Sequence, residues 1–72
     1  MKKVLIFGSG SIGNHMAFAS RKLNHDVYVT DIKSSALQRM KSKIFPKRYK
    51  KWDKKINLIG YKNVFNSKKN MI

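Results

Sequence analysis

A glycine-rich segment near the amino terminus constrains the fold of this chain more than any other feature. Residues 8–13 read Gly-Ser-Gly-Ser-Ile-Gly and directly follow the apolar run 3–7, which contains β-branched and aromatic residues. A short apolar run that ends at glycine is typical of a buried strand in a parallel sheet. From Ser11 onward apolar residues recur every three or four positions, which predicts a helix. A strand, a glycine turn and a helix are therefore expected in immediate succession.

The next elements also follow from spacing. The first helix is expected to bury an apolar face made of Ile12, Met16, Ala19 or Ser20, and Leu23. Asn24 is a residue type that accepts the left-handed conformation at a helix end. Residues 26–30 predict a second strand, and Asp31 lies where that strand should end.

A second helix is expected next, with Ser34 or Ser35 as its cap and an apolar face formed by Leu37, Met40 and Ile44. Pro46 should close this helix because proline disfavours helical geometry at the residue before it. Further on we expect a short helix that ends at Gly60, with one face formed by Trp52, Ile56 and Ile59. After Asn66 the lysine-rich chain is expected to fray.

These elements predict an α/β fold, namely the incomplete start of a Rossmann fold with parallel strands in the order strand, helix, strand, helix. The dinucleotide-binding start is expected to span residues 1–46, and a basic, partly helical or irregular tail to span 47–72. A mononucleotide-binding half needs three strands, and the pattern shows two. We therefore expect the chain to end about where the third strand would begin, as a truncated product, a split-gene half or a fragment does.

The glycine segment matches Gly-x-Gly-x-x-Gly, the phosphate-binding turn of dinucleotide-binding folds. Gly8 permits the tight turn, Gly10 lacks the Cβ that would block a pyrophosphate, and Gly13 lets the helix approach the sheet. The backbone N–H groups of Ser11 and Ile12 have no partner within the helix, so they point at an anion. We expect these five residues to hold the pyrophosphate of a dinucleotide.

Asp31 follows Gly13 by 18 residues, close to the spacing at which such folds carry an acidic residue for the adenosine ribose. Its carboxylate can accept hydrogen bonds from both ribose hydroxyls and would repel a 2′-phosphate, which favours NAD over NADP. Ile32 is placed against the adenine, and Lys33 offers a positive charge nearby. The alternative interpretation is that the glycines only form a turn and that Asp31 only caps the next helix.

No catalytic or metal-ligating residue is predicted. His15 lies in the first helix beside the expected phosphate site, and His25 lies in the turn before the second strand. Neither has the partners of a catalytic triad or a metal ligand at useful spacing. The chain has no cysteine, and its amino-terminal apolar run is too short for a signal peptide or a membrane span. We expect a cytoplasmic chain without membrane association.

The charge lies mainly in the second half of the chain, with a net +4 over residues 1–40 and a net +10 over residues 41–72. Aromatic residues alternate with basic ones near Trp52, so binding to nucleic-acid phosphates and bases is an alternative function. Fourteen of the 17 basic residues are lysine, which favours a bias of composition over an arginine-rich recognition surface.

The stretch from Val4 to Asp31 resembles the N-terminal part of the glucose-fructose oxidoreductase, inositol dehydrogenase and MocA (Gfo/Idh/MocA) family, and residues 48–53 resemble an insertion found in some of its sugar oxidoreductases. The resemblance implies an NAD(P)-dependent, two-domain enzyme that moves a hydride between a nicotinamide and a sugar or polyol. The family's lysine-containing Glu-Lys-Pro type motif and its substrate domain have no counterpart here, and only Gly8, Gly10, Gly13 and Asp31 map onto the family pattern. We therefore expect a cofactor-binding fragment that is not catalytic alone. It is either inactive by itself or completed by a second chain that supplies the rest of the fold.

Regulatory domains of potassium transport also begin with a strand, a Gly-x-Gly-x-x-Gly turn, a helix and a second strand that ends in Asp. A regulatory nucleotide-binding module of that type is therefore an alternative function. Those domains usually proceed to a third strand soon after the second helix. The basic, aromatic segment around Trp52 favours the oxidoreductase.

Overall fold

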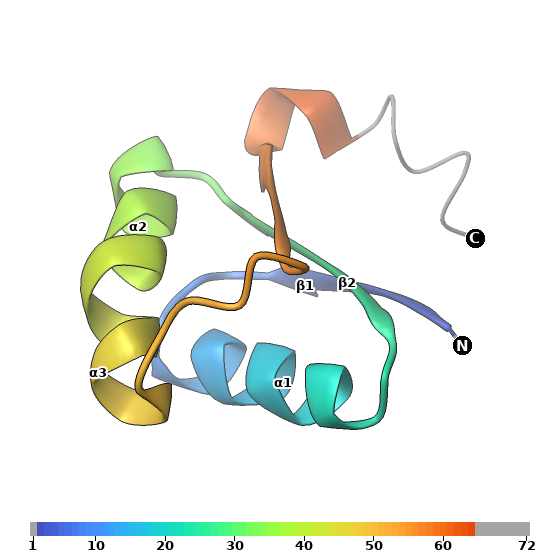
Figure 1. Cartoon of the computed structure of the whole chain (residues 1–72). Helices are drawn as coiled ribbons and strands as arrows, with labels where there is room; N and C mark the ends of the chain where they lie inside the picture. The colour runs from blue at the N-terminus through green and yellow to red at the C-terminus, as the bar shows by residue number, and fades with distance from the viewer. Residues whose placement is uncertain (1, 65–72) are drawn as a thin grey trace.

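The computed structural model describes residues 2–64, which form an α/β fold with a parallel sheet of three strands. The strands are β1 (Lys3–Phe7), β2 (Asp26–Asp31) and β3 (Asn57–Gly60), in the spatial order β1-β2-β3. Helix α1 (Ser11–Lys22) connects the first two strands. The second connection contains α2 (Ser34–Arg39), the π-helical turn η1 (Met40–Ile44) and α3 (Phe45–Tyr49), and a 3₁₀ turn, η2 (Tyr61–Asn63), follows β3 (Figure 1).

The strand register brings the carboxyl ends of all three strands to one edge. Phe7 is paired with Thr30, and Asp31 is paired with Gly60. Because the strands are parallel, the loops that leave these ends lie side by side, and ligands of such folds bind at this edge.

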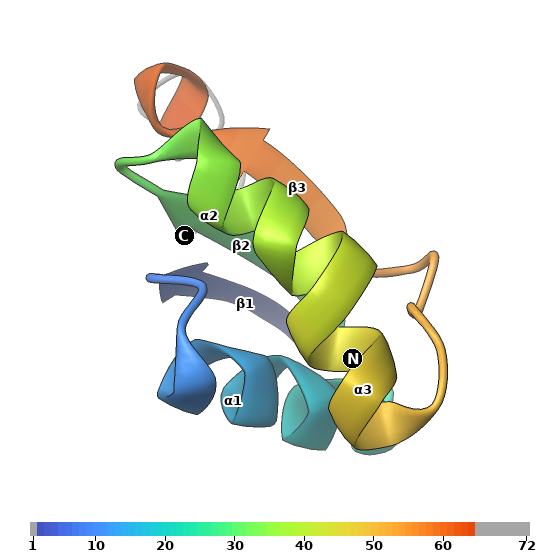
Figure 2. The same ribbon diagram turned by 90° about the vertical axis from the view of Figure 1, so that its left-hand side faces the viewer.

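The core lies between one face of the sheet and the helices. It is centred on Ile6, Val27, Val29, Ala17, Leu37, Met40, Phe45 and Ile56. In Figure 2 the run α2–η1–α3 lies in front of β2 and β3, with α1 beside it. Side chains alternate along a strand, so Leu5, Phe7 and Tyr28 belong to the opposite face, where Phe7 is 63% exposed.

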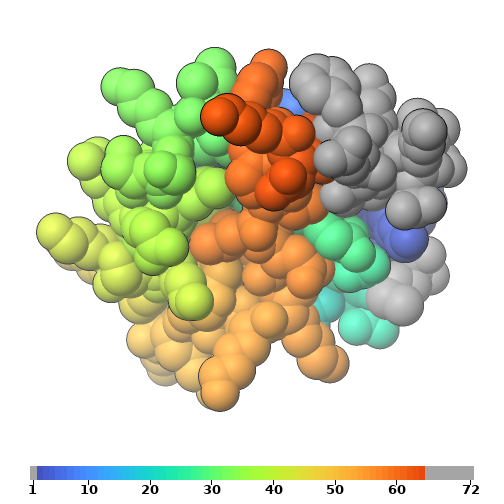
Figure 3. Space-filling view, turned by 90° about the horizontal axis from the view of Figure 1, so that it is seen from above, coloured from blue at the N-terminus to red at the C-terminus, as the bar shows by residue number. Residues whose placement is uncertain are grey.

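The expected short helix before Gly60 is wrong, because the segment forms strand β3. Ile56 is buried and Leu58 packs on the core, whereas Asn57 between them is exposed, which is the alternation of a strand. The hydrogen-bonding edge of β2 satisfies this backbone, and that pairing outweighs a weak helical spacing. The third strand therefore lies within the chain. Figure 3 shows this orange stretch beside the green and yellow helical run. The predicted fraying after Asn66 lies outside the described residues.

Pro46 does not close the second helix, and neither predicted serine caps it. The helical run continues to Tyr49 through η1, where the Phe45 N–H donates to the carbonyl of Met40. The π turn precedes Pro46, which lies in the first turn of α3, the part of a helix that tolerates proline. The cap position of α2 is held by Lys33, without a side-chain hydrogen bond.

The predicted apolar face of α1 is also wrong. Ile12 and Leu23 are 76% and 70% exposed, and the buried residues of the helix are Gly13, Asn14 and Ala17. The start of α1 approaches β1 so closely that small side chains must face the sheet, which turns the larger ones aside. The predicted end is confirmed, since Asn24 has a φ of 61°.

Candidate functional site: the glycine loop and the carboxyl edge of the sheet

The three glycines of the loop have three different environments. Gly8 has a φ of +102°, a conformation that favours glycine, and its N–H donates to the carbonyl of Thr30 at 2.8 Å. A Cβ at Gly13 would collide with the carbonyl of Gly8, while a Cβ at Gly10 would meet no atom within 4 Å. Gly8 therefore makes the turn, Gly13 allows the close packing of α1, and Gly10 faces open space.

The amino terminus of α1 presents free donors. Its cap residue, Gly10, makes no side-chain cap hydrogen bond, and the first turn contains no acidic residue. The N–H groups of Ser11 and Ile12 are among the first of the helix, so they have no intrahelical acceptor. The helix dipole adds partial positive charge at this end. This end of the helix can accept an anion.

The side chain of Asn14 fixes the conformation of the glycine loop through hydrogen bonds. This side chain is fully buried, and its Nδ2 donates to the carbonyls of Ser9 at 2.9 Å and Gly10 at 2.7 Å, while its Oδ1 has no hydrogen-bond partner among residues 2–64. Two hydrogen bonds from one buried amide fix the orientation of both peptide groups. The sequence analysis missed Asn14, although a polar residue directly after the motif, on the side that faces the sheet, was a usable signal.

Asp31 joins the loop to the end of β2. Its Oδ2 accepts hydrogen bonds from the N–H and the hydroxyl of Ser9, both at 2.9 Å, and its Oδ1 accepts one from the N–H of Lys33 at 3.0 Å. The N–H of Lys33, followed by that of Ser9, lowers the pKa of the Asp31 carboxyl, so the group is ionised at neutral pH. Asp31 thus bonds the turn before α2 and the glycine loop, whereas the cap of α2, which the alternative interpretation gave to Asp31, is Lys33.

Two adjoining grooves surround Phe7 and Gly8 at this edge. One, of about 480 Å³, runs along the glycine loop and the start of α1 and is also lined by Ile6, Gly10, Ser11, Ile12, Gly13 and Met16. The other, of about 340 Å³, is also lined by Thr30, Asp31, Ile32 and Tyr61. The structure therefore brings every residue of the predicted cofactor site to this one edge. Tyr61 was missed because the segment before it was interpreted as a helix.

A basic side chain from the second half of the chain also reaches the loop. Arg48, on α3, donates from Nη1 to the Ser11 carbonyl at 3.0 Å and from Nη2 to the Ser11 hydroxyl at 2.6 Å. Helix α3 is held against α1 by the parallel rings of Phe18 and Tyr49, whose centroids are 3.9 Å apart. No sequence spacing indicated this contact, because 37 residues separate its partners.

A cavity of about 570 Å³ lies toward the carboxyl end of α1, beside Phe18, Phe45, Tyr49 and Trp52. These rings contact one another, so the aromatic residues of the basic segment are engaged in packing. About 15 Å of helix, at 1.5 Å per residue, separates Ser11 from Arg21, another residue that lines this cavity. The cavity shares no lining residue with the two grooves at the carboxyl edge.

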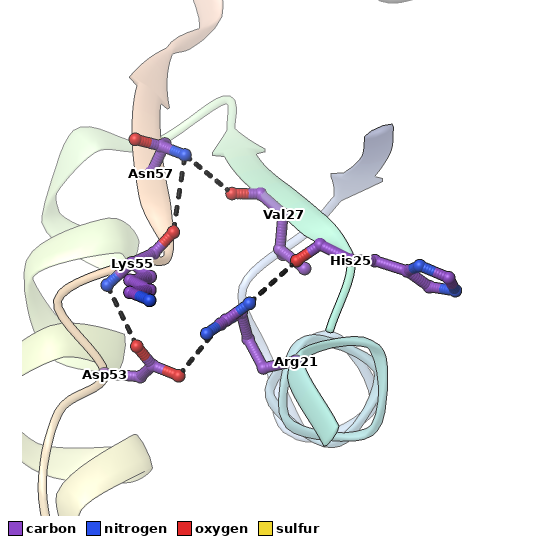
Figure 4. A network of polar contacts seen from close by, with 6 residues as sticks. All are labelled: Arg21, His25, Val27, Asp53, Lys55 and Asn57. Atoms are coloured by element: carbon purple, nitrogen blue, oxygen red, sulfur yellow. Dashed lines mark hydrogen bonds and ion pairs between the residues drawn. The ribbon is translucent and has the colours of Figure 1, made fainter. Parts of the chain in front are cut away.

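A network of polar contacts joins the carboxyl end of α1 to the segment before β3 (Figure 4). Arg21 forms an ion pair with Asp53 at 3.0 Å and donates to the carbonyl of His25 at 2.9 Å. Asn57 donates to the carbonyl of Val27 at 3.1 Å. The network ties the segment before β3 to α1 and β2, which is a structural role.

The histidines lie apart from any reactive group. His15 is exposed on α1, and the ring of His25 accepts a hydrogen bond from the N–H of Lys2 at 3.3 Å. Within residues 2–64 no three His, Cys, Asp or Glu side chains converge as metal ligands. None of the helices in that range is both long and apolar enough to cross a membrane.

No family model, curated protein or solved structure matches this chain. The resemblance to the Gfo/Idh/MocA family therefore stays a prediction.

Proposed function

We propose that this chain is the NAD-binding N-terminal unit of a sugar or polyol oxidoreductase of the Gfo/Idh/MocA type, and that it binds cofactor without performing catalysis alone. One observation carries the proposal. The glycine loop, the open amino terminus of α1 and the ionised Asp31 lie together around two adjoining grooves. A dianionic pyrophosphate and a ribose fit the chemistry of these groups.

The residues present fit the ADP half of NAD. Open space above Gly10 leaves room for phosphate oxygens, and the N–H groups of Ser11 and Ile12 are donors for them. Ile32 and Tyr61 line the groove beside Asp31, and both offer apolar surface to an adenine. When bound, NAD supplies a hydride acceptor or, reduced, a hydride donor. The residues of this chain bind and orient its adenosine diphosphate portion.

The hydrogen bonds of Asp31 support a preference for NAD over a cofactor with a 2′-phosphate. A carboxylate offers about four acceptor positions, and three are used by Ser9 and Lys33. One remains for a ribose hydroxyl, so contact with both hydroxyls requires one of the existing bonds to open. The negative charge disfavours NADP, because a second anion would lie against it.

A second chain that completes the fold belongs to the proposal. Several large apolar side chains on β1, on α1 and at the end of α1 are exposed to solvent. Each of them is at least 48% exposed: Phe7, Ile12, Met16 and Leu23. Exposed apolar side chains grouped in this way form a surface that proteins usually cover.

NMR-detected titration of the purified chain with NAD tests the proposal. We expect the amide signals of residues 8–13 and of Asp31 to shift with NAD and to shift less with NADP. Asp31→Ala should weaken NAD binding about tenfold, since hydrogen bonds to charged groups contribute about 1.5–3 kcal/mol. Asp26→Ala, at the other end of β2, is the matched control. Absence of NAD binding at millimolar concentrations, or equal binding by the two variants, contradicts the proposal.

A further inference from the structure

We propose that Arg48 is a phosphate-binding residue of this site, whose guanidinium donates hydrogen bonds to the pyrophosphate of the bound dinucleotide. The inference rests on the proposed function and assigns a role to the basic segment, which the glycine motif leaves without one. It also makes the site bipartite, with one part from the loop after β1 and the other from α3.

The position of the guanidinium is the first argument. Both of its terminal nitrogens contact Ser11, at 2.6 Å and 3.0 Å, the first residue of α1. Ser11 also lines the groove along the glycine loop. The guanidinium therefore lies beside the residue whose N–H we propose to bind a phosphate, and the long arginine side chain can turn toward that phosphate.

The electrostatic setting is the second argument. A cation at the amino terminus of a helix is disfavoured by the helix dipole, which carries about +0.5 charge there. Arg48 is nevertheless held at that end. The first turn of α1 contains no acidic residue, and within residues 2–64 the ion pair present joins Arg21 to Asp53. The carboxylate of Asp31 is bonded to Ser9 in the same loop, whereas Arg48 and the start of α1 are two adjoining positive groups that favour an anion.

The hydrogen-bonding capacity of arginine is the third argument. A guanidinium has five N–H donors in a planar fork, and the two contacts with Ser11 leave three of them for oxygens of a ligand. The ring stack of Phe18 on Tyr49 fixes the adjacent residue of α3, so the side chain starts from a rigid support. Preorganised arginine forks suit phosphate oxygens better than lysine does.

The test compares Arg48→Gln with Lys47→Gln, which removes an equal charge from the exposed neighbouring residue of the same helix. NMR-detected titrations with ADP, NAD and adenosine measure the dissociation constants. We expect Arg48→Gln to weaken ADP and NAD roughly tenfold or more, the effect of one charge-assisted contact, and to leave adenosine unchanged. Arg48→Lys should recover part of the affinity, and Lys47→Gln should change it less than twofold.

The outcomes separate this inference from the proposed function. If the unmodified chain binds neither NAD nor ADP, the proposed function fails, and the role of Arg48 fails with it. If the chain binds both and Arg48→Gln binds ADP as tightly as Lys47→Gln does, the proposed function stands and the role of Arg48 is overturned. A parallel loss of adenosine binding in Arg48→Gln also overturns it, because the residue would then act through the fold. A far-UV circular dichroism melt of each variant confirms that folded protein is compared.

Discussion

Each end of helix α1 is contacted by an arginine, and the two arginines are in opposite circumstances. At the carboxyl end, Arg21 is half-buried, pairs with Asp53 and lies where the helix dipole favours a cation. At the amino end, Arg48 is exposed and lies where the dipole disfavours one. The first end has its charges balanced by the protein itself, whereas the second has glycine, free N–H groups and a cation. The carboxyl end of α1 therefore contributes to stability, and the amino end is the one that we propose binds a ligand.

Gly13→Ala should have the largest effect on stability, because it disrupts the close packing of the amino end of α1 against the glycine loop. The added Cβ would collide with the backbone carbonyl of Gly8, which cannot move without opening the turn. We expect a loss of about 3 kcal/mol in the free energy of unfolding, most of what a domain this small possesses. Urea denaturation followed by circular dichroism measures it. A variant as stable as the parent would show that α1 can withdraw from β1.

Gly10→Ala, in the same loop, should weaken NAD binding while changing the free energy of unfolding only slightly. Its Cβ would enter open space, and its φ of −80° suits alanine, so we expect a cost within about 1 kcal/mol. NAD binding should weaken at least tenfold, because the methyl group occupies the place of phosphate oxygens. Gly13→Ala, in which stability is expected to fall, is the control for Gly10→Ala. Unchanged NAD affinity in Gly10→Ala would show that the loop does not bind the phosphates.

Asp53→Asn tests the carboxyl end of α1, where Asp53 forms an ion pair with Arg21. The ion pair with Arg21 is partly solvated, with the two side chains 16% and 32% exposed, so its loss should cost about 0.5–1 kcal/mol. A double-mutant cycle with Arg21→Gln, followed by thermal denaturation, measures the coupling. NAD affinity should not change. A Kd for NAD that rises as much as it does in Gly10→Ala would mean that the two ends of α1 are not independent.

The smallest expected effect is a pH dependence carried by Asp31. Its folded pKa lies below its ordinary value of 3.8, so it contributes stability above that pH, and the contribution is lost as the pH falls through the folded pKa. Asp31→Asn should therefore lose less stability than the parent does on acidification below about pH 4. Asp26→Asn controls for removal of a carboxylate from the same strand. Equal acid sensitivity of the two variants would contradict this contribution.

Local signals predicted the first half of the molecule well. The structure confirms β1, the start and end of α1, β2 and the different reasons for Gly8 and Gly13. The failures come from backbone contacts that a count of apolar spacing does not include. Strand β3 exists because β2, far away in the sequence, offers an edge. A π turn precedes Pro46, and Gly13 packs on Gly8, so in these two cases the neighbour is near in sequence but acts through backbone geometry.

The sequence by itself determined the glycine turn, the start of α1 and the position of Asp31 after β2. Glycine conformations, helix starts and the placement of an acid after a strand are local properties. Tertiary structure alone decided that the carboxyl ends of three strands meet, that Tyr61 joins Asp31 and Ile32, and that Arg48 crosses 37 residues to reach Ser11. The physical reason is that a contact between distant residues depends on how the elements pack. That packing is a property of the whole core and of no single segment.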